Sequence, residues 1–205
     1  RNLSVFFLID VSESMLYSST DKLKIEYAAE LAATLSYTII NAGDSIGFAL
    51  FNDKIIEHVS PRQGFKQHFT LLKRLVDPRY YGGKYDLSEA LKFTMAAIKQ
   101  SAIFIIISDF IGLKNNWKSD IRVLGKKFDL IGIMVRDPRD FTLPDYHGNV
   151  TLGDVYTNKQ MTVDIDSIKE DYEKAAETRL KELHRVFSES GSDFMSLNTD
   201  TNFVK

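Results

Sequence analysis

The segment LSVFFLIDVSESM, residues 3–15, decides the fold. Its first seven residues are mostly apolar on both faces, which is typical of a parallel strand covered by helices on both sides. Directly after this run, Asp10, Ser12 and Ser14 stand at alternate positions and present one carboxylate and two hydroxyls. Ligand sites of open α/β sheets lie just beyond the carboxyl ends of the strands. The segment therefore predicts a buried strand that leads into a site, although the three polar residues taken alone fit a turn cap equally well.

Apolar runs alternate with helical patterns along the rest of the chain. Further strands are expected at 45–51, 102–108, 128–135 and 193–200, and residues 54–60 are expected to pair antiparallel with 45–51 at an edge. Helices are expected at 22–40, 65–76, 86–100, 115–126 and 167–190. The alternation predicts an α/β doubly wound, Rossmann-like fold, with a mainly parallel sheet, one antiparallel edge strand and helices on both faces.

One connection is longer than α/β connections usually are. Between 136 and 166, two prolines interrupt regular structure, and VTLGDVYT and QMTVDI alternate enough to pair as a small hairpin. We expect a single domain over 1–205, with a hairpin excursion at about 145–165.

Composition limits the classes of function. The 205 residues carry 26 Lys and Arg against 28 Asp and Glu, so the net charge of −2 provides no general attraction to nucleic acid. No apolar run approaches the roughly 18 residues that span a bilayer, so we expect no membrane insertion by this segment. The chain has no Cys. This excludes thiolate metal sites and fits a reducing compartment, and we expect a cytoplasmic location.

A second carboxylate is expected beside the first. Asp109 ends the strand at 102–108 as Asp10 ends the first strand, and both strands are expected near the centre of the sheet. Two carboxylates and two hydroxyls form an all-oxygen set, which suits Mg²⁺ or Mn²⁺ better than Zn²⁺.

These residues also carry a family resemblance. IDVSESM resembles the Asp-x-Ser-x-Ser signature of the von Willebrand factor A-type (vWA) domain, whose metal-ion-dependent adhesion site (MIDAS) adds a Thr from a second loop and an Asp from a third. IIISDF, 105–110, supplies that Asp as Asp109, and YYGGKYDLSEAL, 80–91, resembles the second loop. The stretch RDPRDFTLPDYHGNVTLGD, 136–154, and the segments after it narrow the resemblance to the prokaryotic domain-of-unknown-function-58 subgroup.

The second loop departs from that family's pattern. Gly-Thr-Asp-Leu is expected there, whereas Gly83 is followed by Lys84, Tyr85, Asp86 and Leu87. No short hydroxyl is available, and Lys84 adds a competing cation, so we expect weak metal binding. Asp86 is a candidate fifth ligand in place of capping its helix, and Gly83, Lys84 and Tyr85 are candidates for a rim that contacts a partner.

Two classes of function remain open. The resemblance implies a non-enzymatic protein-interaction module, which would act as an adaptor with a MoxR-type AAA+ ATPase or bind a client protein. The alternative is a metal-dependent hydrolase or phosphotransferase that uses Asp10. We rank it lower because haloacid-dehalogenase-like enzymes, which also have an Asp at the end of their first strand, need a second Asp two residues later. This chain has Ser12 at that position.

Overall fold

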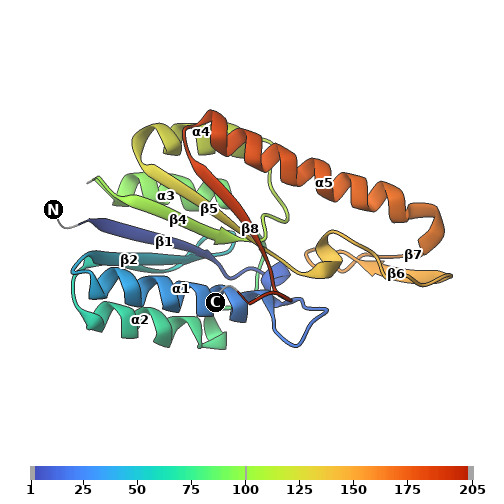
Figure 1. The fold of residues 1–205 in the computed structure, drawn as a ribbon, viewed down its shortest axis with the longest axis horizontal. Coiled ribbons are helices and arrows are strands. Elements are labelled where there is room, and N and C mark those ends of the chain that lie inside the picture. The colour runs from blue at the N-terminus through green and yellow to red at the C-terminus, as the bar shows by residue number, and fades with distance from the viewer. Residues whose placement is uncertain (1–2, 100, 203–205) are drawn as a thin grey trace.

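A six-stranded sheet forms the centre of the computed structural model, which describes residues 3–99 and 101–202 (Figure 1). The strand order is β3-β2-β1-β4-β5-β8, and every neighbouring pair is parallel except β2 and β3. The strands are β1 (Ser4–Asp10), β2 (Ser45–Phe51), β3 (Ile55–Arg62), β4 (Ile103–Ser108), β5 (Asp129–Arg136) and β8 (Asp193–Asn198). The predicted fold class, including the antiparallel edge strand, is confirmed.

Helices cover both faces of the sheet. They are α1 (Lys24–Asn41), α2 (Phe65–Leu75), α3 (Leu87–Ala97), α4 (Trp117–Lys127) and α5 (Ile165–Glu189). One core cluster joins the sheet to α1 and α2, and the other joins it to α3, α4 and α5. Along β1, Phe6 and Leu8 enter one cluster while Phe7 and Ile9 enter the other, which explains why the strand is apolar on both sides.

The predicted helices agree with the observed ones to within about three residues at each end, which is ordinary for helix boundaries. The last residue of the helix predicted over 86–100 lies outside the described residues. The described residues also form short 3-10 turns: η1 (Glu13–Leu16), η2 (Pro78–Tyr80) and η3 (Pro138–Asp140).

The excursion after β5 contains a separate two-stranded antiparallel sheet of β6 (Asn149–Gly153) and β7 (Gln160–Asp164). The loop between them includes Asn158 at a positive φ of 55°. Helix α5 starts directly after β7, and the hairpin lies beyond the carboxyl ends of the strands, under the first turns of this helix (Figure 1).

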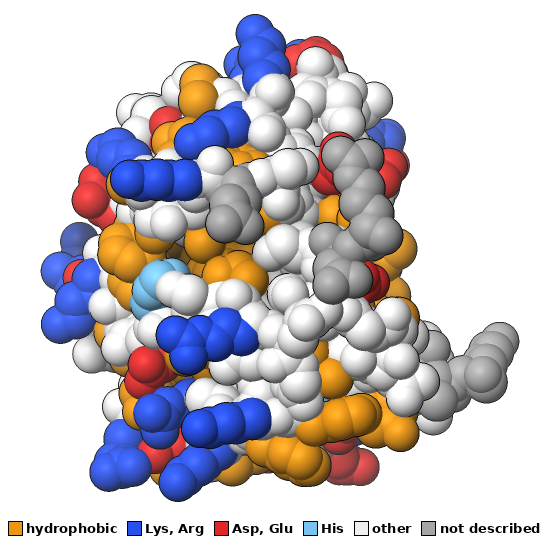
Figure 2. Space-filling view, turned by 90° about the vertical axis from the view of Figure 1, so that its left-hand side faces the viewer, with side chains coloured by type: hydrophobic (Ala, Val, Ile, Leu, Met, Phe, Trp, Pro, Cys, Tyr) orange, Lys and Arg blue, Asp and Glu red, His pale blue; other side chains and the backbone are white. Residues whose placement is uncertain are grey.

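The opposite end of the molecule, facing the amino ends of the parallel strands, has a different surface. In Figure 2, Lys and Arg side chains gather toward the left and the lower edge, with hydrophobic side chains visible between them. The buried carboxylates described next belong to the other end, where the hairpin lies.

Candidate functional site

Asp10 and Asp109 leave the sheet at the same rim. β1 and β4 are parallel neighbours with Ile9 opposite Ile107, so both chains emerge at adjacent carboxyl ends. The chain continues from β1 to β2 on one side and from β4 to β5 on the other, which makes this the switch point of the sheet. The predicted convergence of the two residues at one rim is confirmed.

Asp10 is fully buried, and both of its oxygens accept hydrogen bonds. The Ser12 amide donates to Oδ1 at 2.8 Å, and the Ser108 hydroxyl donates to Oδ2 at 2.7 Å. Burial, and then the charge of Asp109, raise the pKa of Asp10 to about 7, and the bonds from Ser12 and Ser108 offset part of this rise. This carboxyl group therefore changes its charge near neutral pH.

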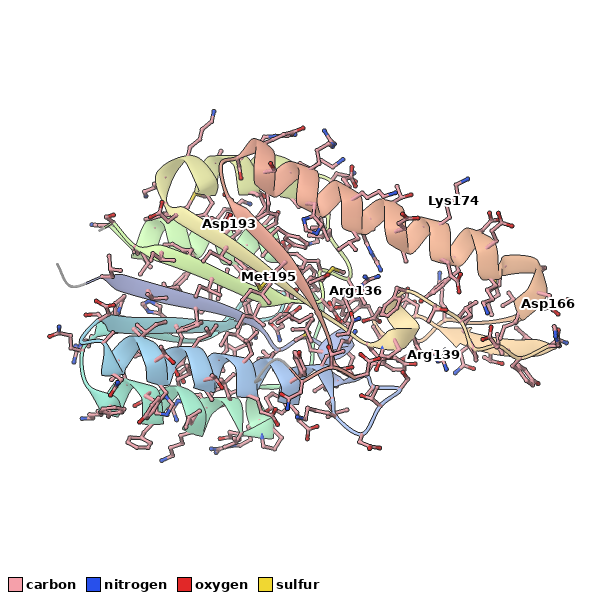
Figure 3. All side chains as sticks on the ribbon, in the orientation of Figure 1. Arg136, Arg139, Asp166, Lys174, Asp193 and Met195 are labelled. Atoms are coloured by element: carbon pink, nitrogen blue, oxygen red, sulfur yellow. The ribbon has the colours of Figure 1, made fainter. Side chains whose placement is uncertain are left out.

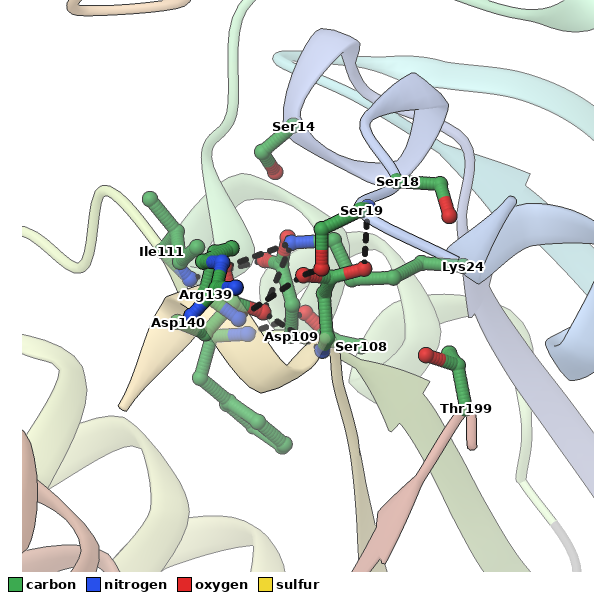
Figure 4. Close-up of polar contacts among 12 residues, drawn as sticks. Ser14, Ser18, Ser19, Lys24, Ser108, Asp109, Ile111, Arg139, Asp140 and Thr199 are labelled. Atoms are coloured by element: carbon green, nitrogen blue, oxygen red, sulfur yellow. Dashed lines mark hydrogen bonds and ion pairs between the residues drawn. The ribbon is translucent and has the colours of Figure 1, made fainter. Parts of the chain in front are cut away.

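Asp109 is paired with a lysine that comes from α1. The Lys24 ammonium lies 2.8 Å from Asp109 Oδ2 and 2.9 Å from Asp140 Oδ2, and Lys24 is only 1% exposed (Figure 4). The Ile111 amide donates to the other oxygen of Asp109 at 2.9 Å. Burial lowers the pKa of Lys24, but the two carboxylates outweigh burial and the net shift is upward. Lys24 thus remains a buried cation at the rim.

Asp137, the buried N-cap residue of η3, connects this turn to the loop after β1. Asp137 accepts hydrogen bonds from the Ser19 amide at 2.6 Å and from the Ser19 hydroxyl at 2.5 Å. Its own amide donates to Asp140 at 2.9 Å. The capping residues of η3 therefore fix both the loop after β1 and the Asp140 carboxylate that Lys24 contacts.

The two serines of the first loop meet a tyrosine from the hairpin. The Tyr156 hydroxyl donates to Ser14 Oγ at 2.8 Å and lies 3.1 Å from Ser12 Oγ and 3.2 Å from the Ile111 carbonyl oxygen. Ser12 and Ser14 are buried. Burial raises the pKa of Tyr156 to about 12, so the phenol stays protonated at neutral pH. Tyr156 thereby covers the pair of serine hydroxyls.

Two residues of the second loop, Tyr85 and Asp86, have different environments. Asp86 caps α3 by accepting from the Glu89 amide at 3.2 Å, and it forms an ion pair with Lys114. Tyr85 is only 4% exposed and packs on Phe51, so it points inward and does not present a surface to a partner. The Ser108 hydroxyl lies 3.3 Å from the Tyr85 hydroxyl.

This arrangement corrects one detail of the predicted rim. Asp86 caps α3, because the amides of the first turn of this helix need an acceptor. Of the three predicted rim residues, Gly83 and Lys84 are exposed, whereas Tyr85 fills the core beside Ser108. Asp86 as a metal ligand stays a prediction.

The donor set suits a hard cation, but competing groups already surround it. Asp10, Ser12, Ser14 and Asp109 offer only oxygen, which Mg²⁺ and Mn²⁺ prefer. However, Lys24 contacts Asp109, and Tyr156 contacts both serines. Within residues 3–99 and 101–202, no group of three or more His, Cys, Asp or Glu side chains is arranged to hold a metal. Any ion here would depend on the serine hydroxyls and would compete with an ammonium group.

A cavity of about 680 Å³ opens beside these residues. Its walls come from the loop after β1, from η3 and the segment that follows it, from the hairpin and from α5. Ser14, Lys24, Asp140 and Tyr156 all line it, so the rim is one wall of a larger pocket.

Known proteins and one protein family resemble this chain in sequence. The family model described as "Protein of unknown function DUF58" matches residues 1–182. The chain belongs to this family. Proteins similar to this DUF58 chain include "Uncharacterized protein Rv1480" of Mycobacterium tuberculosis, 27% identical over 207 residues, with 100% of this chain and 65% of that protein covered. "Uncharacterized protein MAV169" of Mycobacterium avium is 30% identical over 150 residues, with 71% of this chain and 87% of that protein covered. The chain thus spans about two thirds of the length of the first of these relatives.

Solved structures share the fold of this DUF58 chain. An aerotolerance-related membrane protein from Bacteroides fragilis aligns with a TM-score of 0.64 at 12% identity, covering 97% of this chain and 92% of that one. The SpRpn10 VWA domain aligns with a TM-score of 0.57 at 11% identity, covering 98% and 91%. At such identities the likeness shows the fold alone, and that fold is VWA-like. In the described part of the DUF58 chain, no helix is both long and apolar enough to cross a membrane.

Sequence reasoning missed Lys24, Asp137, Asp140 and Tyr156. One signal could have found Lys24, since it stands at a core phase of the amphipathic helix together with Ala28 and Leu31. A lysine on an apolar stripe implies a buried partner. Tyr156 had no such signal, because it lies in the loop between two short strands.

Proposed function

We propose that this chain is a non-enzymatic protein-interaction module, and that its recognition surface is the carboxyl-end rim, where Ser14 and Lys24 border the cavity and Asp10, Ser12 and Asp109 lie buried behind them. The observation that carries the proposal is the convergence of these buried polar groups at the switch point of a VWA-like sheet, beside an open cavity that Ser14 and Lys24 line. An ionisable group in a cleft whose pKa is shifted by burial and by a specific charge is a candidate for a functional site.

The geometry of Asp10 does not favour nucleophilic catalysis. A carboxylate nucleophile must reach its substrate, whereas Asp10 is fully buried and both of its oxygens are engaged by Ser12 and Ser108. The residue two positions later is Ser12, so the acid that a phosphotransferase of this type needs is replaced by a hydroxyl.

The proposal includes weak binding of Mg²⁺ or Mn²⁺. Asp10, Ser12, Ser14 and Asp109 are the residues that would hold the ion, and its contribution would be to accept a carboxylate oxygen from a partner. Lys24 and Tyr156 oppose such binding, because the first supplies a positive charge and the second occupies the serine hydroxyls. We therefore expect this module to be only weakly metal-dependent.

The proposed partner is a MoxR-type AAA+ ATPase, as the family resemblance implies, for which the chain would serve as an adaptor. The test is a pull-down of that ATPase from the same organism, with and without Mg²⁺. Asp109→Asn should weaken capture, because it removes one of the two carboxylate charges that hold Lys24 at the cavity wall. The matched control is Asp129→Asn, which changes an exposed carboxylate at the amino end of β5 and should leave capture unchanged.

Thermal melts show whether Asp109→Asn remains folded, and Ser14→Ala provides a second rim variant that removes only one hydroxyl. Equal capture by the wild-type protein and both rim variants would contradict recognition by the rim. Hydrolysis of a phosphate ester that depends on Asp10 would favour the enzyme instead.

A further inference from the structure

The outer edge of β6 borders the cavity beside the rim. All residues from Val150 to Tyr156 line this cavity, and among the described residues that line it none belongs to β7. If a face of the hairpin formed the wall, side chains of both strands would contribute, because paired residues of a hairpin share a face. The cavity therefore meets the edge of β6 and not the face of the hairpin.

The main chain of this edge is open for pairing. The Asp154 amide donates to the Lys159 carbonyl, and the Gly148 carbonyl accepts from the Ile165 amide. Since groups alternate along an antiparallel strand, Val150 and Leu152 direct their amides and carbonyls at β7. Those of Asn149, Thr151 and Gly153 point to the other side, and all three residues are exposed. A Cβ added at Gly153 would meet no atom within 4 Å.

This edge lacks the usual protection of an exposed strand. Edges are commonly blocked by Lys, Pro, a bulge or a covering segment. β6 reads NVTLG, which contains neither Lys nor Pro nor any charged residue, and its register with β7 is continuous. An unprotected edge that borders a cavity is a template for a further strand.

One charged group of the cavity wall has no partner among the described residues. Lys24 contacts two carboxylates, and Asp154 accepts from the amides of Tyr156 and Thr157. The Arg139 guanidinium, in contrast, donates no hydrogen bond and forms no ion pair within the described residues, although it helps to lower the pKa of Asp145, a carboxylate that pairs with Lys169. Figure 3 labels Arg139 between the end of the sheet and the hairpin. An unpaired guanidinium suits a carboxylate, which it can bind through two parallel hydrogen bonds.

We propose that β6 binds an extended, acidic peptide segment of a partner protein as a third strand, with a carboxylate of that segment on Arg139. This inference rests on the proposed interaction function and names the chemistry of its partner. Main-chain pairing supplies affinity and side-chain contacts supply specificity in this mode of recognition. Five residues of strand span about 17 Å, and 680 Å³ is within the range of ligand pockets, about 300–1,000 Å³. A single extended segment fits this space better than the two-stranded edge of a second copy.

A matched pair of proline variants tests the pairing. Thr151→Pro removes one outward amide from the β6 edge, and the β6–β7 ladder stays intact because that amide does not face β7. Thr162→Pro makes the same change in the residue opposite Thr151, on the outer edge of β7. Both variants lose the same hydroxyl contact between Thr151 and Thr162, so they differ only in which edge is blocked.

The probe is a phage-displayed pool of random eight-residue peptides, selected on the wild-type protein and resynthesised for fluorescence anisotropy. We expect sequences that contain Asp or Glu, and binding that weakens at least about tenfold in Thr151→Pro and in Arg139→Gln but less than about twofold in Thr162→Pro. The amide protons of Thr151 and Gly153 should become protected from exchange on binding.

Three results would overturn the inference: no peptide enriched over selection on Thr151→Pro, equal losses in the two proline variants, or a dimer that Thr151→Pro dissociates. The last result would mean that the edge pairs with a second copy. The two proposals fail separately. A wild-type protein that captures the ATPase but binds no peptide contradicts this inference alone.

Discussion

The ammonium group of Lys24 lies 2.8 Å from the carboxylate of Asp109, and both side chains are almost completely buried. The lysine stands in the first turn of α1, where the positive end of the helix dipole disfavours a cation. Two carboxylates, Asp109 and Asp140, offset that cost. The rim thus contains a cation that is part of the protein, the Lys24 ammonium group.

Replacing this cation should destabilise the fold. Lys24→Met keeps most of the side-chain volume but leaves Asp109 and Asp140 buried without a counter-charge, which typically costs roughly 3–5 kcal/mol. Urea denaturation measures the loss. Lys92→Met is the control, since it removes an exposed pair with Glu89 that contributes little to stability in water.

The same variant tests whether Lys24 competes with a metal. We expect excess Mg²⁺ to raise the melting temperature of Lys24→Met by several degrees and to change that of the wild-type protein little, because a divalent ion can then neutralise the two carboxylates. An equal effect of Mg²⁺ on both proteins would show that the ammonium does not oppose metal binding.

Tyr156 should control access to the serine pair. Tyr156→Phe removes the hydroxyl that contacts Ser12, Ser14 and the Ile111 carbonyl, and we expect a loss of about 1 kcal/mol of stability. Because both serines are then free, calorimetry should detect stronger Mn²⁺ binding than in the wild-type protein. Tyr146→Phe, which changes an exposed tyrosine of the same excursion, should alter neither quantity.

A close contact between sheet and helix limits β5 to glycine at one position. A Cβ at Gly132 would lie 2.6 Å from ring carbons of Phe187 on α5 and 2.8 Å from Phe194. Gly132→Ala should therefore cost about 1–3 kcal/mol by overpacking. Gly153→Ala meets open space and should change stability by less than about 0.5 kcal/mol. Similar denaturation midpoints for the two variants would contradict the packing argument.

The strands were predictable because each is a short, continuous run of mostly apolar residues, as in LSVFFLI and AIFIIIS. The convergence of Asp10 and Asp109 was predictable as well, since each follows a central strand of a parallel sheet. The partners of these carboxylates were not. Lys24 comes from a helix and Tyr156 from a loop, and only the folded chain brings them to the rim. Local periodicity carries no information about such contacts.

The pKa of Asp10 predicts how stability depends on pH. Its folded pKa is about 7, against an ordinary value of 3.8, so the folded protein holds the proton more tightly than the unfolded chain does. Between pH 4 and pH 7 the folded state binds more protons, and stability from this group therefore falls as pH rises through that window. Above pH 7 the buried carboxylate is charged in both states, and the full cost of its burial remains.

Asp10→Asn removes this dependence, because the amide is neutral at every pH and still accepts from the Ser12 amide. With EDTA present, we expect the variant to match the wild-type protein near pH 5 and to exceed its stability at pH 8 by on the order of 1–3 kcal/mol. Urea denaturation at a series of pH values measures the difference between the two proteins, which cancels the contribution of other groups. A variant that is less stable than the wild-type protein at pH 8 would mean that the Asp10 carboxylate is stabilised by its surroundings.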